Sequence, residues 1–208
     1  MSAIIFDFDG TIADSFEVIV GIFYEVTKRE VRLDDAEIER LRGMSLVQAA
    51  EELRIPAWKM PFLIYRGRRR MSKLMSHIAV HRGIPETIRK LQAEGHQLFI
   101  VSSNSEKNIR IFLDKHHMTN EFVNIYGSVG LLGKARILKK VIRKNNLDPH
   151  DTWYVGDEVR DIVGAFHADL PIISASWGFN TAEILAAHNP TALVSTPNNI
   201  ITVLEETN

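Results

Sequence analysis

Two aspartates, Asp7 and Asp9, directly follow a short apolar run at residues 3–6. The run contains β-branched residues and no polar alternation, which predicts a strand buried on both faces of a parallel sheet. Side chains two residues apart on an extended chain project to the same side. Because open parallel sheets bind ligands beyond the carboxyl ends of their strands, this carboxylate pair is the first candidate for chemistry.

Two more apolar runs end in polar residues that could take part in chemistry. The run at 98–101 leads into Ser102, Ser103 and Asn104, and the run at 153–155 leads into Asp157, Glu158 and Asp161. Lys134 begins a predicted helix after residues 130–133. All these sets fall at or just past a strand end, so we expect them to meet at one edge of the sheet.

Five carboxylates near one point would repel one another strongly. Two unit charges about 4 Å apart repel by about 4 kcal/mol at an effective dielectric of 20. Lys134 supplies one compensating charge, and a hard divalent ion would supply the rest. With no cysteine in the chain and no paired histidines in these segments, Mg²⁺ suits the oxygen ligands best. A carboxylate in that setting is an adequate nucleophile toward phosphorus, while Ser102 and backbone amides can hold phosphoryl oxygens.

The elements that must position these residues alternate along the chain. Further apolar runs occur at 122–126, 172–174 and 192–194, and amphipathic helical stretches occur at 87–94, 135–144, 159–168 and 181–187. This alternation predicts an α/β fold with a Rossmann-like, mostly parallel sheet and helices on both faces. Residues 15–80 break the rhythm with helical stripes only. We expect a small α-helical cap domain (15–80) inserted after the first strand, and a discontinuous catalytic core formed by 1–14 and 81–208.

Composition excludes several classes of protein. The chain has 208 residues, of which 45% are hydrophobic, and no apolar run reaches the length of a membrane span. Its 25 basic and 26 acidic residues give a net charge of −1, so we expect no nucleic-acid partner and no membrane partner. Without cysteine there are no disulfides. The N-terminus shows no signal-peptide pattern, so we expect a cytoplasmic protein.

Four motifs in order resemble those of the haloacid dehalogenase-like (HAD) hydrolases. Asp7-Phe8-Asp9-Gly10-Thr11 resembles the first motif, residues 98–104 the second, Lys134 the third and residues 156–161 the fourth. The resemblance covers the whole chain and includes the position of the cap. Trp177-Gly178-Phe179-Asn180 and the helix after it are similar to the phosphoglycolate-phosphatase-like subgroup.

The resemblance implies a role for each matching residue. Asp7 would attack phosphorus, and Asp9 would protonate the leaving oxygen and then deprotonate a water. Mg²⁺ would be held by Asp7, the Asp9 carbonyl and Asp157, with Asp161 either a ligand through water or a residue that orients Lys134. Phosphate would be bound by Ser102, with help from Ser103 and Asn104, and by Lys134. Glu158 replaces a small or hydroxyl residue, and it would either ligate the metal or face solvent.

Cationic residues of the predicted cap are candidates for contacts with the substrate. Arg42, in the segment 42–45 between two cap helices, is a candidate for reading the substrate as the cap closes. Arg66, Arg68, Arg69 and Arg70 lie on a predicted helix at 58–75. A charge run of this kind is usually a solvated face, although one arginine could meet a second anionic group of the substrate.

The sequence therefore predicts a Mg²⁺-dependent phosphatase, similar to phosphoglycolate phosphatase, that hydrolyses a small phosphorylated metabolite through an aspartyl-phosphate. One alternative is a phosphomutase of the β-phosphoglucomutase type, which would use the same acids. Another is a phosphoacceptor signalling or binding module, although such modules usually lack a cap. We expect a monomer or a homodimer.

Overall fold

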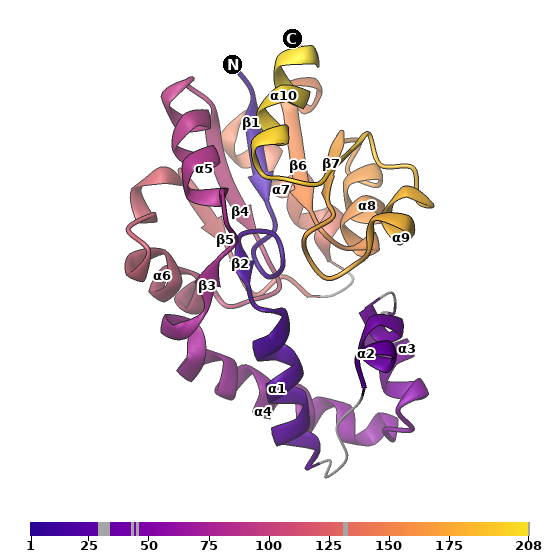
Figure 1. The fold of residues 1–208 in the computed structure, drawn as a ribbon. Coiled ribbons are helices and arrows are strands. Elements are labelled where there is room, and N and C mark those ends of the chain that lie inside the picture. The colour runs from indigo at the N-terminus through magenta and orange to yellow at the C-terminus, as the bar shows by residue number, and fades with distance from the viewer. Residues whose placement is uncertain (29–33, 43, 45, 131–132, 208) are drawn as a thin grey trace.

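The computed structural model describes residues 1–28, 34–42, 44, 46–130 and 133–207 (Figure 1). Within these ranges six parallel strands form one sheet in the order β5-β4-β1-β6-β7-β8. In chain order the strands are β1 (Ala3–Phe6), β4 (Gln97–Val101), β5 (Asn124–Tyr126), β6 (Thr152–Gly156), β7 (Ile172–Ala175) and β8 (Ala192–Val194). The predicted α/β fold with a parallel sheet is confirmed, and each strand lies where an apolar run predicted it.

The first strand lies in the interior of the sheet. Ala3 of β1 pairs with Gln97 of β4 on one side and with Thr152 of β6 on the other. All four residues of β1 are buried, as its unbroken apolar sequence requires. The carboxyl ends of β1, β4 and β6 therefore lie side by side, and polar residues that follow them share one edge.

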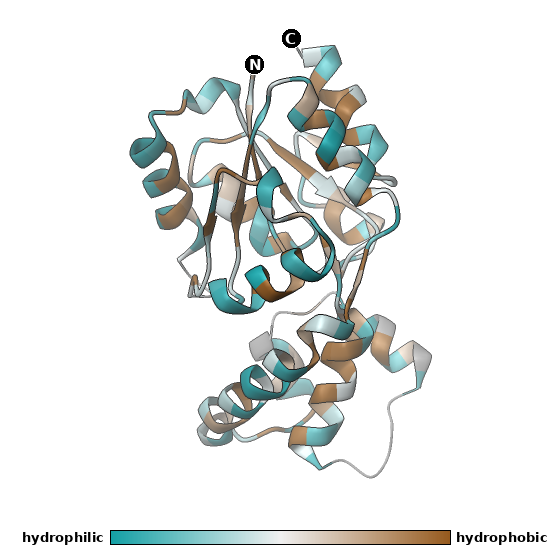
Figure 2. Ribbon diagram, turned by 90° about the vertical axis from the view of Figure 1, so that its left-hand side faces the viewer, coloured by the Kyte–Doolittle hydropathy of each residue, from teal (hydrophilic) through white to brown (hydrophobic). Residues whose placement is uncertain are grey.

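Helices cover both faces of the sheet, as predicted. On one face Phe6, Ile100 and Val155 pack against α5 (Ile84–Ala93), α6 (Glu106–Lys115) and α10 (Asn198–Thr207). On the other face Ile5 and Phe99 pack against α7 (Lys134–Asn145) and α8 (Val159–Phe166). Figure 2 shows the apolar strands in brown, enclosed by helices whose outer surfaces are largely teal. Alternate strand residues thus supply two separate cores, which fix the register of β1.

A set of helices lies between the first strand and the rest of the core. It contains α1 (Phe16–Thr27), α2 (Asp35–Arg42), α3 (Leu46–Glu52) and α4 (Met60–Leu74), and we call residues 15–80 the helical insertion. In Figure 1 these helices lie beyond the carboxyl end of β1. The longer of the predicted helices, 58–75, is confirmed as α4 with a short 3₁₀ turn on either side.

Two short strands join the insertion to the core. β2 (Ala13–Asp14) and β3 (Ala79–Val80) pair antiparallel, and the amide of His81 donates to the carbonyl of Ile12 at 3.0 Å. The chain thus leaves and re-enters the core at one place, which Figure 2 shows as a narrow neck. None of the described helices has the length and apolar composition of a membrane span.

Candidate active site

Asp7 is the residue that follows β1, and it is almost completely buried. Its amide continues the strand ladder by donating to the carbonyl of Val155 at 2.8 Å. One carboxylate oxygen, Oδ1, accepts the amide of Phe8 at 2.8 Å, and Oδ2 accepts Lys134 Nζ at 2.8 Å. Burial raises the pKa of the Asp7 carboxyl, although the charge of Lys134 opposes that shift. The strand end therefore holds a fixed, desolvated carboxylate.

Lys134 reaches this carboxylate from the first residue of α7. Its stem lies against α8 at Gly164, where an added Cβ would come within 3.1 Å of Lys134 Cγ. Nζ donates to both Asp7 and Asp161. Burial alone would lower the pKa of Lys134, but the charges of Asp161 and Asp7 outweigh it and raise the pKa. The lysine is thus a buried permanent cation, which explains a positive charge at a helix N-terminus that would otherwise be unfavourable.

Asp157 follows β6, and its carboxylate is fully buried. Thr11 Oγ1 donates to Oδ1 at 2.6 Å, and the amide of Phe179 donates to Oδ2 at 2.7 Å. The carboxylate packs directly against Gly10 and Gly178, and a Cβ at either position would overlap it. Gly10 also has a φ of 81°, a backbone conformation that favours glycine. Burial raises the pKa of Asp157 well above its ordinary value.

Asp161 uses both carboxylate oxygens within the protein. Oδ1 accepts Lys134 Nζ, and Oδ2 accepts the amides of Asp157 at 3.1 Å and Glu158 at 3.0 Å. It lies at the third position of α8, where its side chain completes a capping box with Glu158. Of the two roles that the resemblance left open for Asp161, this geometry supports orienting Lys134.

Glu158 has a partner of its own. Arg160 donates through Nε at 2.9 Å and Nη2 at 2.5 Å to Glu158 Oε1, and the Glu158 side chain is only 18% exposed. Burial raises the pKa of Glu158 to about 7, against the opposing charge of Arg160. The Glu158 side chain is therefore mostly shielded from solvent, and its charge is paired with that of Arg160.

Asp9 is held by the loop that follows β4. Asn104 Nδ2 donates to Asp9 Oδ2 at 3.0 Å, and the Asn104 amide in turn donates to Ser102 Oγ at 3.1 Å. Asn108 on α6 fixes the Asn104 amide group by donating to its Oδ1 at 2.9 Å. Burial and the neighbouring Asp7 raise the pKa of Asp9 to about 6. A carboxyl that titrates near neutrality suits a group that gives and takes a proton.

The donor set suits a hard divalent cation. Asp7, Asp157 and Asp161 each offer a carboxylate oxygen, and these atoms lie within 4.8 Å of one another. In the described part of the chain no amide donates to the Asp9 carbonyl, which leaves that oxygen available as well. Among the described residues Lys134 is the one cation in an ion pair with these carboxylates, and such buried oxygen ligands favour Mg²⁺ over softer metals.

The structure does not bring every predicted site residue into this cluster. Ser102 directly follows β4 and is fully buried. Ser103 is half-buried, and its side chain makes no hydrogen bond among the described residues. The Arg42 guanidinium lies over the Phe16 ring, 4.0 Å from its centroid. Gly43 and Ser45 of the segment 42–45 lie outside the described residues, as do residues 131–132 before Lys134.

The backbone of Arg42 does meet the core beside the site. Asn180 Nδ2 donates to the Arg42 carbonyl, while Asn180 Oδ1 accepts the amide of Val159 at the start of α8 at 2.8 Å. The amide of Asn180 donates to the Asp157 carbonyl at 3.2 Å. Asn180 therefore links the end of α2 to the loop that carries Asp157.

Some functional partners were missed by reasoning from the sequence. Thr11 and the Phe179 amide hold Asp157, and the Tyr154 hydroxyl lies 3.4 Å from Asp161 Oδ1. Thr11 and Phe179 belong to the motifs that carry the resemblance, which was the available signal. Tyr154 reads in the sequence only as an apolar strand residue, and its hydroxyl gives no local signal.

An acid cluster with a paired lysine, at the ends of two adjacent parallel strands, is an arrangement suited to phosphoryl transfer. The model of the haloacid dehalogenase-like hydrolase family matches residues 4–175. The chain belongs to this family, within its phosphoglycolate-phosphatase-like subgroup, and it is an enzyme of the phosphatase type.

Two relatives illustrate the subgroup. The chain is 29% identical over 203 residues to a phosphoglycolate phosphatase of Synechococcus elongatus, covering 97% of this chain and 96% of the relative. It is 30% identical to a 5'-nucleotidase of Pseudomonas aeruginosa, covering 90% of this chain and 88% of the relative.

Solved structures share the fold. A crystal structure described as a predicted phosphatase from Clostridium acetobutylicum superposes with a TM-score of 0.85 at 23% identity, covering 99% of this chain and 98% of the other. A haloacid dehalogenase-like hydrolase from Streptococcus pneumoniae gives 0.83 at 19% identity, with 98% of each chain covered. Both likenesses include the helical insertion as well as the sheet.

Proposed function

We propose that this enzyme hydrolyses a small phosphate monoester, with Asp7 as nucleophile, Asp9 as general acid and base, and Mg²⁺ as cofactor. The observation that carries the proposal is the cluster of Asp7, Lys134 and Asp157 at two adjacent strand ends, with Asp9 held 3.0 Å from the Asn104 amide group beside it. If the acid cluster were purely structural, there would be no need for Asp9 to be held beside it by its own hydrogen bond from Asn104.

The first half-reaction uses Asp7 and Asp9. An Asp7 carboxylate oxygen attacks phosphorus, the bond from phosphorus to the ester oxygen breaks, and that oxygen takes the proton of Asp9. Lys134 is positioned to neutralise charge on the phosphoryl oxygens, because its Nζ already lies 2.8 Å from Asp7. Ser102 and the amides around it would bind the same oxygens.

The second half-reaction restores the enzyme. Asp9, now ionised, takes a proton from water, and the water oxygen attacks the phosphorus of the aspartyl-phosphate. The bond between phosphorus and the Asp7 oxygen breaks, which releases inorganic phosphate and the Asp7 carboxylate. When bound by Asp7, Asp157 and the Asp9 carbonyl, Mg²⁺ supplies further positive charge that favours attack by one anion on another.

The substrate is proposed to be a small metabolite, with the helical insertion acting as a cap over the site. The relatives named phosphoglycolate phosphatase and 5'-nucleotidase suggest two substrates to test first, 2-phosphoglycolate and a nucleoside 5'-monophosphate. We also propose that residues 1–14 and 81–208 act as the catalytic core, and 15–80 as the cap.

Phosphate release from a panel of monoesters tests the proposal, with Mg²⁺ and with chelator. The panel contains 2-phosphoglycolate, a nucleoside 5'-monophosphate and a hexose phosphate. We expect turnover that requires Mg²⁺ and disappears in Asp7→Asn, while the exposed Asp151→Asn control keeps it. Turnover that survives in Asp7→Asn refutes the nucleophile. Phosphorylation of Asp7 without release of phosphate would favour a mutase or a signalling module instead.

A further inference from the structure

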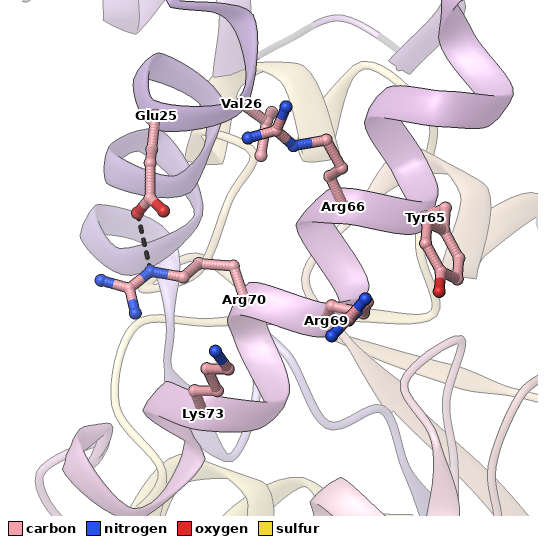
Figure 3. A pocket seen from close by; sticks show the side chains of 7 residues that line it. All are labelled: Glu25, Val26, Tyr65, Arg66, Arg69, Arg70 and Lys73. Atoms are coloured by element: carbon pink, nitrogen blue, oxygen red, sulfur yellow. Dashed lines mark hydrogen bonds and ion pairs between the residues drawn. The ribbon is translucent and has the colours of Figure 1, made fainter.

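A groove of about 220 Å³ lies between α1 and α4 of the helical insertion (Figure 3). It shares no lining residue with the carboxylate site. The polar side chains that line it are Glu25 of α1 and Tyr65, Arg66, Arg69, Arg70 and Lys73 of α4. Four positive charges thus face one negative charge.

The four cations occupy one face of α4. Positions 66, 69, 70 and 73 follow the spacing of three, four and seven residues that places side chains on the same side of a helix. Like charges at this spacing destabilise a helix, so the arrangement costs stability unless an anion lies among them. Arg68 is exposed on another face of the helix and does not line the groove.

Charge compensation within the groove is incomplete. Arg70 pairs with Glu25 at 2.7 Å, as Figure 3 shows. Arg66 and Arg69 lie over the rings of Phe62 and Tyr65, at 5.5 and 5.9 Å from the centroids. Among the described residues no carboxylate oxygen comes within 4.0 Å of Arg66, Arg69 or Lys73. Arg66 is half-buried, whereas Arg69 and Lys73 are exposed, and all three line the groove.

We propose that this groove binds the di- or triphosphate group of a small anion. The guanidinium groups of Arg66 and Arg69 and the ammonium group of Lys73 can donate hydrogen bonds to the oxygens of a phosphate chain. A ligand with a single carboxylate would neutralise only one of these three positive charges. Tyr65, which is 58% exposed, offers a ring on which a nucleotide base can stack. The shared chemistry is the phosphate chain, whose source is either an inorganic polyphosphate or a nucleotide.

The groove is separate from the carboxylate site. The insertion approaches that site through Met75, whose sulfur lies 4.0 Å from Asn104 Nδ2. Lys73, the lining residue nearest Met75 in the chain, precedes it by two residues, which at 3.6 residues per turn puts the two side chains on opposite sides of the helix. Arg66 precedes Met75 by nine residues, about 14 Å along the helix axis at 1.5 Å per residue. A phosphate chain in the groove is therefore distinct from a phosphoryl group beside Asp7.

Calorimetric titration of the native protein tests this site, with sodium tripolyphosphate and ATP as probes in chelator and 50 mM NaCl. Without metal the acid cluster repels anions, and an assay for released phosphate verifies that neither probe is hydrolysed. We expect one site per chain whose affinity falls as salt is raised. Arg66→Glu with Arg69→Glu should weaken binding at least about tenfold, because charge-assisted hydrogen bonds are lost.

Arg68→Glu is the matched control for Arg66→Glu alone, since each changes the charge of the same helix by two units and Arg68 lies outside the groove. It should leave the affinity within about twofold and the circular dichroism unchanged. Equal weakening by Arg68→Glu, absence of binding, or loss of binding in Ser102→Ala would each overturn the proposal. Tighter binding of ATP than of tripolyphosphate, abolished by Tyr65→Ala, identifies a nucleotide; equal affinities identify the phosphate chain alone.

Discussion

Replacing Lys134 by methionine should destabilise the fold as well as abolish catalysis. The lysine is 6% exposed and bonds to two buried carboxylates, Asp7 and Asp161. Methionine keeps most of the volume of the stem that packs against Gly164, so the change removes mainly the charge. Removing one partner of a buried ion pair typically costs about 3–5 kcal/mol of unfolding free energy. For a chain of this size that is a fall in Tm of roughly 6–20 °C.

The assay is thermal unfolding in chelator, with Lys139→Met as the control. Lys139 lies on the same helix, but its pair with Asp169 at 3.1 Å is solvent-exposed, so its loss should change the free energy by less than about 1 kcal/mol. In a double-mutant cycle, Lys134→Met with Asp161→Asn should be less destabilising than the sum of the single changes, by about 1–3 kcal/mol. Equal Tm values for Lys134→Met and Lys139→Met would refute the reasoning.

Other perturbations test the surroundings of the site. In chelator the protein should lose stability as the pH rises from 5 to 8, because the folded-state pKa values of Asp9 (about 6) and Glu158 (about 7) lie above those of the unfolded chain. The folded chain then holds more protons than the unfolded one, and the lowered pKa of His81, caused by burial, opposes this trend only in part. Denaturant unfolding across that range checks the sign, and rising stability contradicts it. Arg42→Ala should change the ratio of kcat/KM between two phosphate esters by about tenfold if this end of α2 reads the leaving group, since one pocket contact is worth about 1–3 kcal/mol; an unchanged ratio would rule this out. Asn180→Ala leaves the first amide of α8 without its acceptor, so chemical denaturation should show a loss of about 1–3 kcal/mol, and an undiminished midpoint would show that water replaces the side chain.

Much of the core could be predicted because buried parallel strands have a strong local pattern. Apolar runs located the six strands, and the rule that ligands bind beyond the strand ends grouped Asp7, Lys134 and Asp157 at one edge of the sheet. The strands β2 and β3 were missed as strands, since two residues each give no periodicity. Their positions were still marked as the flanks of the insertion.

The finer organisation of the site depends on contacts between distant segments. Thr11 and Asp157 are 146 residues apart, and nothing in the local sequence of either indicates their hydrogen bond. Two roles are open to Asp161 from the sequence, and only the fold shows that its oxygens accept Lys134 and two amides. Glu158 is different, because its partner Arg160 is only two residues away, and their ion pair is an alternative to both the metal contact and the solvent exposure expected from the sequence.

The interior position of β1 also constrains how the enzyme is made. The strand that carries Asp7 is synthesised first, yet its two neighbours begin at Gln97 and Thr152. Closing loops of this length before any contact is gained makes such pairing slow. During synthesis one neighbour of this strand becomes available with β4, but the second becomes available only when β6 has left the ribosome. A chain that ends before residue 156 would carry Asp7 and Lys134 but lack Asp157 and Asp161.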